Sequence, residues 1–364
     1  MMNTRFILLI AVLIVAVSAG QVFAVSDAAV LSLMISPGAR AAGMGEAFVA
    51  VANDATAPFW NPAGLANIKN KELHFMHSKW LPNLADDLFY DFASFVYPMQ
   101  DIGTFGVNVT FLNLGEQIHT DETGNQLGTF NSNEYSIAAT YGTKLSQDWA
   151  VGLGLRYIRS NLSSVSVGAE QGDGIGNAFA FDLATMYTLP FHRKLTLGMN
   201  LSNMGPKITY VDAAQADPLP TNLKLGFAYN VVESEYNKLT VVGDLNKMMV
   251  TRDNDGSADP FYQALFTSPW MVEETTTTEN DDGEEVTSTE KMFNGTVSGG
   301  LEYWYSGIFA LRAGYYWDQP GEVEFFSFGG GVQYHLYRFD FAYVAADEGH
   351  PLANTMRFSL TIGV

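Results

Sequence analysis

The chain has 364 residues, no cysteine and a formal net charge of −20. The acidic balance argues against nucleic-acid partners, because proteins neutralise phosphates with lysine and arginine, and the lack of cysteine excludes a disulfide-stapled secreted domain. The 34 glycines, 25 phenylalanines and 17 tyrosines favour a β-barrel, which can take a chain of this length as one unit.

Residues 1–24 predict an export signal. Arg5 precedes an apolar run from Phe6 to Gly20, and the small residues Val22 and Ala24 fit a signal-peptidase site. The run has about fifteen residues, whereas a membrane-spanning helix needs roughly twenty. We therefore expect cleavage after Ala24, with a retained membrane anchor as the weaker alternative.

Residues 25–67 predict a hatch folded inside the periplasmic half of the barrel. The segment is rich in alanine and glycine and does not alternate like a strand. In "FWNPAGLA", Asn61 can cap a short helix whose first residue is Pro62. Arg40 should pair with a carboxylate of the barrel wall, because an unpaired buried charge is costly. The candidate hatch residues are Arg40, Gly43, Gly45, Asn53, Asp54, Trp60, Asn61 and Pro62, and we expect Trp60 and Pro62 to be buried.

From Lys71 onward, apolar and polar residues alternate in segments of about ten residues. In "FGVNVTFLNL", Phe105 and Val107 point to one side and Asn108 to the other, as in a strand with one apolar face. Fourteen such segments begin near residues 72, 88, 104, 134, 149, 177, 195, 221, 238, 295, 308, 325, 337 and 355. The even count is typical of an outer-membrane barrel.

The connections alternate in length. Those after even-numbered segments are short: "PMQDIG", "SQD", "LPFHRK", "VESEYN", "SG" and "LY". Long ones follow odd-numbered segments, at residues 114–133, 160–176, 203–220, 247–294 and 345–354. Short periplasmic turns and long extracellular loops are typical of outer-membrane barrels. The strands of a soluble β-sandwich also alternate apolar and polar residues. A sandwich gives no reason, however, for short connections to follow even-numbered strands and long ones to follow odd-numbered strands. We predict an all-β fold, a 14-stranded antiparallel outer-membrane barrel over residues 68–364.

The strand faces opposite the apolar ones should line the lumen, while the apolar faces contact outer-membrane lipid. The expected lumen residues carry both signs of charge. They are Arg156, Asp182, Lys224, Asp244, Glu302, Arg312, Arg338, Asp340 and Arg357, together with Asn108, Asn200 and His335.

Catalytic and metal-binding patterns are weak, and we expect no enzyme activity, cofactor or metal. His74 and His77 are an odd number of residues apart on a strand, so they face opposite sides. Residues 253–259, "DNDGSAD", partly resemble a calcium loop but lack the distal glutamate, which favours an acidic turn. Eleven acidic residues and Arg252 lie within residues 251–290, a composition typical of a solvated loop.

Several stretches resemble known families. "SPGARAAGMGEAFVAVANDATAPFWNPAGLA" is similar to the N-terminal hatch of FadL-type barrels, which have fourteen strands. "LSNMGPKITYVDAAQADPLPTNLKLGFAY", "LRYIRSNL" and the closing "MRFSLTIGV" resemble the PorV family of the type IX secretion system more closely. The acidic stretch at residues 251–290 departs from that family.

The resemblance implies a role in protein secretion at the bacterial outer membrane. PorV proteins associate with the large translocon barrel, bind the C-terminal signal domains of cargo and deliver them to a surface attachment complex with sortase activity. Two alternatives stay open: a FadL-like channel for hydrophobic small molecules, and a structural barrel that holds other surface proteins. An apolar pocket around the hatch with a gap in the wall would favour the channel.

Overall fold

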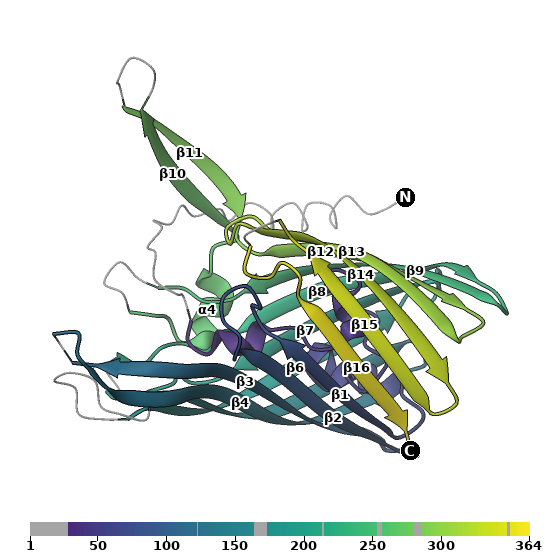
Figure 1. Ribbon diagram of the computed structural model, residues 1–364. Helices are drawn as coiled ribbons and strands as arrows, with labels where there is room; N and C mark the ends of the chain where they lie inside the picture. The colour runs from purple at the N-terminus through teal and green to yellow at the C-terminus, as the bar shows by residue number, and fades with distance from the viewer. Residues whose placement is uncertain are drawn as a thin grey trace.

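The computed structural model describes residues 28–121, 123–163, 173–212, 215–252, 257–279, 285–347 and 350–364. The expected signal peptide and most of the calcium-like stretch lie outside these residues. Fourteen strands close into one antiparallel barrel (Figure 1), so the predicted all-β class and strand count are confirmed. Strands β1 and β16 pair and close the ring. Among the described residues, no helix is long and apolar enough to cross a membrane.

Thirteen of the fourteen barrel strands begin within three residues of the predicted positions, and β4 begins eight residues before its predicted start near 134. The fourteen strands are β1 (Glu72–Lys79), β2 (Phe89–Met99), β3 (Gly103–Thr120), β4 (Gln126–Lys144), β5 (Trp149–Ser163), β6 (Gly174–Thr188), β7 (Leu195–Met204), β8 (Asn222–Glu233), β9 (Asn237–Met248), β12 (Thr296–Tyr305), β13 (Phe309–Asp318), β14 (Val323–Tyr334), β15 (Tyr337–Ala345) and β16 (Met356–Gly363). Short turns join β2 to β3, β4 to β5 and the other predicted pairs. This end of the barrel is therefore the periplasmic end.

Alternation along each strand sorts side chains between the two faces of the wall. On β3, Phe105 and Val107 are exposed on the outside, whereas Asn108 is buried on the inside. A membrane barrel presents its apolar side outward to lipid. His74 and His77 separate in the same way, because His74 is buried and His77 is exposed.

Two expected loops contain regular structure. Strands β3 and β4 continue to pair through residues 114–133, with a register shift after Asn113. The expected loop at residues 247–294 contains helix α4 (Phe261–Thr267) and a separate hairpin of β10 (Met271–Glu279) and β11 (Glu285–Phe293). Both segments still connect barrel strands, as predicted, and the apolar alternation that identified the barrel strands did not indicate this regular structure.

The N-terminal segment, residues 28–67, lies inside the ring of strands, where its short helices are drawn in purple (Figure 1). Its elements are η1 (Leu31–Met34), α2 (Ala39–Ala42), α3 (Ala57–Trp60) and η2 (Pro62–Asn67). The segment is not restricted to the periplasmic half. Near its start, Val30 and Leu33 pack against Ile158 of β5 and Ala178 of β6, toward the extracellular end, because these apolar side chains gain burial there.

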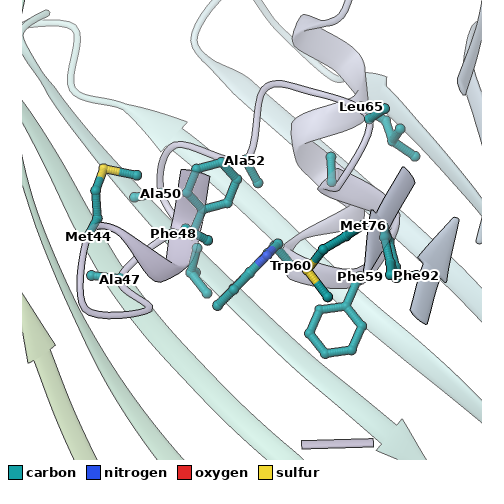
Figure 2. Close-up of a cluster of buried hydrophobic side chains, with 14 of the residues drawn as sticks. Met44, Ala47, Phe48, Ala50, Ala52, Phe59, Trp60, Leu65, Met76 and Phe92 are labelled. Atoms are coloured by element: carbon teal, nitrogen blue, oxygen red, sulfur yellow. The ribbon is translucent and has the colours of Figure 1, made fainter. Parts of the chain in front are cut away.

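Apolar side chains of the N-terminal segment form the main core of the protein together with inward-facing residues of β1 and β2 (Figure 2). Trp60 is at its centre and is 1% exposed. The Trp60 ring meets the rings of Phe48 and Phe59 edge to face, at centroid distances of 5.6 and 5.8 Å. Phe59 in turn packs against Phe92 of β2. The core therefore joins the segment to the wall.

Candidate functional site

Glycines on the inner face of the wall allow the N-terminal segment to approach closely. A Cβ atom at Gly314 of β13 would clash with the backbone of Met44 and Gly45, and one at Gly152 of β5 would clash with Pro62 and Ala63. Further inward glycines on β7 and β12 meet the segment in the same way. The wall is thus shaped to this segment on several sides of the lumen.

Two glycines of the segment complete this contact. Gly45 has a positive φ of 66°, and a side chain there would clash with the backbone of Tyr315. Its backbone N–H donates to Ser327 Oγ at 2.9 Å. Gly43 lies against Gly329, where a Cβ would be 3.1 Å from the neighbouring Cα. Both candidate glycines therefore lie where backbone meets backbone.

Polar side chains of the wall bind the main chain of the segment. Asp244 of β9 accepts hydrogen bonds from the N–H groups of Phe48 and Val49, at 2.6 and 2.8 Å. Asn200 of β7 donates to the Trp60 carbonyl at 3.0 Å. These bonds satisfy main-chain groups that are buried away from water.

A closed ring of six charged side chains links the segment to three strands. Its members alternate in sign, in the order Asp54, Arg40, Glu302, Arg312, Asp340, Arg338 and back to Asp54. Asp54 and Arg40 come from the segment, and the others come from β12, β13 and β15. The side chains are at most 12% exposed. Because three arginines face three carboxylates, the ring can stay buried with no net charge.

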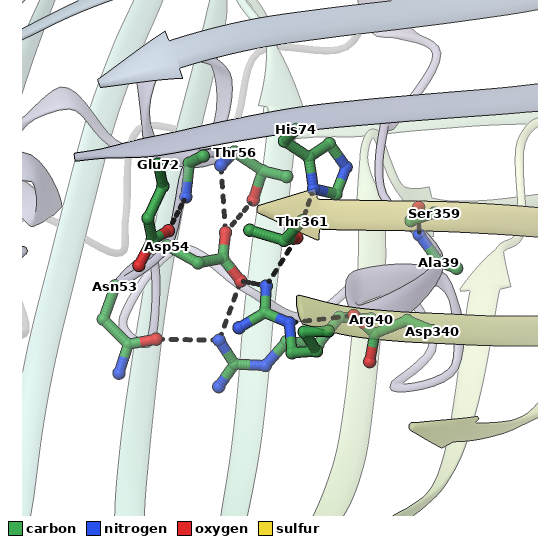
Figure 3. A network of polar contacts seen from close by, with 12 residues as sticks. Ala39, Arg40, Asn53, Asp54, Thr56, Glu72, His74, Asp340, Ser359 and Thr361 are labelled. Atoms are coloured by element: carbon green, nitrogen blue, oxygen red, sulfur yellow. Dashed lines mark hydrogen bonds and ion pairs between the residues drawn. The ribbon is translucent and has the colours of Figure 1, made fainter. Parts of the chain in front are cut away.

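The contacts on the segment's side of the ring are short. Arg40 Nη1 is 2.9 Å from Asp54 Oδ2, and Arg338 Nη2 reaches the same oxygen at 2.9 Å. Asn53 Oδ1 also accepts from Arg40 Nη1 at 2.8 Å. Figure 3 shows these contacts around Asp54, whose second carboxylate oxygen accepts from the Thr56 N–H and hydroxyl. Asp54 therefore joins two arginines to the start of α3.

The pairing of the wall strands brings the other four side chains of the ring next to one another. Glu302 and Arg312 are direct cross-strand partners on β12 and β13, with Arg312 Nε donating to Glu302 Oε2 at 2.7 Å. Arg312 Nη1 lies 2.9 Å from Asp340 Oδ1, close enough for an ion pair but not aligned as a hydrogen bond. Arg338 Nε donates to Asp340 Oδ2 at 2.9 Å. Burying two carboxylates and two arginines side by side would be costly unless each were paired.

Asn61 begins the last helix of the segment. Its side-chain oxygen accepts from the Ala63 N–H at 3.0 Å and caps η2, a 3-10 helix with Pro62 as its first residue. The same amide donates to the Val49 carbonyl at 2.9 Å. Trp60 Nε1 donates to the Pro37 carbonyl at 3.0 Å. Pro62 and Trp60 are both buried.

The remaining expected lumen residues are buried on the inner face. Arg156 and Asp182 form an ion pair at 3.0 Å. Lys224 Nζ lies 4.4 Å from the centre of the Trp60 ring, a cation–π arrangement. Arg357 Nη1 donates to a carbonyl of the segment, and Arg357 Nη2 pairs with Glu46 at 2.9 Å.

The structure differs from the sequence prediction at two residues, His335 and Glu46. His335 is an exposed residue with a positive φ in the turn between β14 and β15, so it does not line the lumen. Strand β14 ends at Tyr334, one residue before His335, so the alternation of the strand does not extend to this side chain. Glu46 was overlooked as an anchor, although it is the lone acidic residue in "ARAAGMGEAF".

A polar cleft of about 360 Å³ opens beneath the ring at the periplasmic end, and Arg40, Asn53 and Glu302 are among its lining residues. The ring is thus reachable from this side. Within the described ranges, no three His, Cys, Asp or Glu side chains are grouped to hold a metal ion. The arrangement is suited to holding the segment in the lumen.

Comparison with known proteins gives a family and a fold. The family model described as "Type IX secretion system protein PorV" matches residues 19–255. The curated proteins searched contain no match.

Solved structures of similar fold include two described as toluene transporters. TbuX of Ralstonia pickettii has a TM-score of 0.53 and 12% identity, covering 90% of this chain and 98% of its own. TodX of P. putida has a TM-score of 0.53 and 13% identity, covering 90% and 99%. A FadL homologue of Pseudomonas aeruginosa has a TM-score of 0.52 and 11% identity, covering 89% and 97%. At such identities the similarity shows the fold alone.

Proposed function

The chain belongs to the PorV family of type IX secretion system proteins, and on this premise we propose that it binds the C-terminal signal domains of cargo and shuttles them from the translocon barrel to the surface attachment complex. It is a β-barrel of the bacterial outer membrane. The proposal concerns what the barrel carries and which partners it meets.

The filled lumen is the observation that favours this role. The N-terminal segment, acting as a hatch, is held by the ion-pair ring, by the Asp244 hydrogen bonds and by close glycine contacts. A folded signal domain cannot enter a lumen filled in this way, so cargo must meet the protein from outside. Adaptable loops on a rigid scaffold are the usual place for such recognition.

Two projections offer that surface at the extracellular end. The β3–β4 hairpin continues beyond Asn113 to Thr120, and the β10–β11 hairpin forms its own two-stranded sheet (Figure 1). Both extend the protein outward and provide contact area that the barrel rim lacks. We infer that cargo signal domains bind between or along these projections.

The test is a strain that lacks this protein. We expect proteins bearing type IX signals to be lost from the cell surface, with their signal domains uncleaved. Re-expression of the intact chain should restore them, whereas a related outer-membrane barrel at the same level should not. Normal surface display in the null strain would contradict the proposal.

A channel for hydrophobic small molecules is the second candidate. The fold similarity to proteins described as toluene transporters supports it. Uptake of a labelled monoaromatic compound by the null strain separates the two functions. Impaired uptake with normal secretion would favour the channel, and normal uptake with impaired secretion would favour the shuttle.

A further inference from the structure

The barrel wall has a step beside β7 on its extracellular side. Strand β7 ends at Met204, which pairs with Phe181 of β6, whereas β6 continues to Gly174. Beyond Met204 the chain turns inward, and Ile208 and Leu219 pack with buried residues of β5 and β6. Among the described strands, the upper part of β6 therefore has no paired strand on this side.

Helix α4 lies at this step. The ring of Phe261 meets the ring of Phe181 edge to face, at a centroid distance of 5.8 Å and an interplanar angle of 85°. On the inner side, Phe261 and Ala264 border the same small cavity as Leu219 and Met249. The helix thus covers the place where the wall is incomplete.

The C-terminal end of α4 is fixed to the protein. After the helix, Ser268 Oγ accepts from Lys247 Nζ at 2.9 Å. At its C-terminal end, Thr267 Oγ1 donates to Asp259 Oδ2 at 2.6 Å. Since Ala264 and Ser268 are buried, the opposite side of the helix is fixed facing outward.

The outward side of α4 is divided into an aromatic and a polar half. Successive helical residues are about 100° apart, so Tyr262 and Phe266 share one direction and Gln263 and Thr267 share the next. Phe266 is 89% exposed and Tyr262 is 62% exposed. The Tyr262 ring also packs against Phe261 at 5.6 Å, which places the aromatic half next to the contact with Phe181.

Phe181 belongs to the lipid-facing band of the barrel. Along β6, the exposed Phe179, Phe181 and Leu183 alternate with the buried Ala180 and Asp182. The apolar outer face of an outer-membrane strand contacts lipid. The aromatic half of α4 is therefore continuous, through Phe261, with a surface that contacts the membrane.

We propose that α4 is an interfacial anchor that rests against the outer leaflet, with Tyr262 and Phe266 directed into the lipid and Gln263 and Thr267 directed into water. Aromatic side chains are favoured at the membrane–water boundary, and a short amphipathic helix can lie in that plane. The anchor would hold the base of the β10–β11 hairpin, which follows α4 in the chain, at a fixed height above the membrane.

Single cysteines test the proposal directly, because the chain has none of its own. Phe266→Cys and Gln263→Cys are labelled with an environment-sensitive fluorophore, and the full-length protein is reconstituted into phosphatidylcholine vesicles. We expect the label at position 266 to emit at shorter wavelength and to lose intensity when brominated phosphatidylcholine replaces the ordinary lipid. The label at position 263 should instead be quenched by aqueous iodide.

Equal iodide quenching at both positions, with no effect of brominated lipid, would overturn the proposal and leave the aromatic half available to a protein partner. A background variant, Tyr262→Ser with Phe266→Ser, provides a second readout. Its far-ultraviolet circular dichroism checks that the barrel folds. We expect a label at Leu265→Cys to be quenched by brominated lipid in the otherwise native chain and by iodide in the double-serine background, while a label at Gln263→Cys is quenched by iodide in both. Lipid quenching of the Leu265→Cys label that is unchanged by the two serines would contradict the role given to Tyr262 and Phe266.

Discussion

Arg40 of the N-terminal segment and Glu302 of β12 form a two-point ion pair, with Nε to Oε2 at 2.8 Å and Nη2 to Oε1 at 2.7 Å. Both side chains are buried, and the residues are 262 positions apart in the chain. Arg40 also contacts Asp54, and Glu302 also contacts Arg312. The pair is therefore one of two places where the segment's part of the ring meets the wall's part, and the other is the ion pair of Asp54 with Arg338.

Replacing Arg40 with methionine should loosen the N-terminal segment. Asp54 and Glu302 would each lose a partner, and breaking one side of a buried pair typically costs about 3–5 kcal/mol. Hydrogen exchange of the amides in residues 39–60 measures the free energy of local opening. Arg40→Lys should restore only part of the loss, because lysine cannot hold a carboxylate through two parallel bonds.

A charge-balanced double variant separates electrostatics from packing. Arg40→Met with Glu302→Gln removes one charge of each sign, so we expect a smaller loss than the sum of the two single changes. Glu233→Gln is the control, since Glu233 pairs with Lys238 at 3.9 Å on the exposed surface. Such pairs contribute at most about 1 kcal/mol. Additive losses in the double variant would show that the ring is not coupled.

Gly314→Ala should destabilise the packed segment. The new Cβ would meet the backbone of Met44 and Gly45, which cannot rotate away like a flexible side chain. Overpacking of this kind typically costs about 1–3 kcal/mol. The matched control is Gly330→Ala on the adjacent β14, where a Cβ would have only the Ala310 carbonyl oxygen within 4 Å, at 3.8 Å. Increased protease cleavage within residues 28–67 is expected for Gly314→Ala alone.

Asn61→Ala should cost about 1–2 kcal/mol of local stability, the usual size of a lost helix cap. We expect a loss near the upper end of this range, because the Asn61 side-chain amide also donates to the buried Val49 carbonyl. Asn67→Ala, at the exposed last residue of η2, should have little effect. Hydrogen exchange of Ala63 and Gly64 reports the change. Equal exchange in the two variants would show that the capping bond contributes nothing.

Alternation and loop parity were sufficient to predict the barrel, because membrane strands bury their two faces in very different surroundings. The same signal failed where strands leave the membrane. Residues 114–133 pair as a hairpin although Gln117, His119 and Thr129 give no apolar face. In β10 and β11, a threonine-rich acidic sequence likewise has a pairing that alternation of apolar residues cannot indicate.

The sequence predicted the type of partner that Arg40 needs, but not which residue it would be. Arg40 had to find a carboxylate, but several inward carboxylates were available, and the choice of Glu302 depends on how the segment is seated against β12. Glu302 and Arg312 could be paired only after the register of β12 and β13 was known. The six side chains close into a ring only because the fold brings the N-terminal segment and three strands together, and no local sequence pattern indicates this.

The β10–β11 hairpin allows the cargo proposal to be tested without disturbing the barrel. Residues 273–290 contain eight acidic residues and no lysine or arginine. Glu274 and Glu290 are direct cross-strand partners, so an Asn-Gly turn can replace residues 275–289 and keep the base of the hairpin. The ion pair of Glu273 with Lys291, at 2.9 Å, is retained.

The shortened variant should insert normally but display fewer proteins with type IX signals at the surface. A second variant of full length, with the acidic residues at 279–285 changed to their amides, distinguishes charge from shape. If charge is responsible, this variant should be as deficient as the shortened one. Binding of a purified signal domain to the intact barrel should then weaken with salt, because exposed charges are screened beyond about 8 Å at physiological ionic strength. Salt-independent binding with full activity of the amide variant would assign recognition to the shape of the β10–β11 hairpin, whereas full activity of the shortened variant would assign it to the β3–β4 hairpin instead.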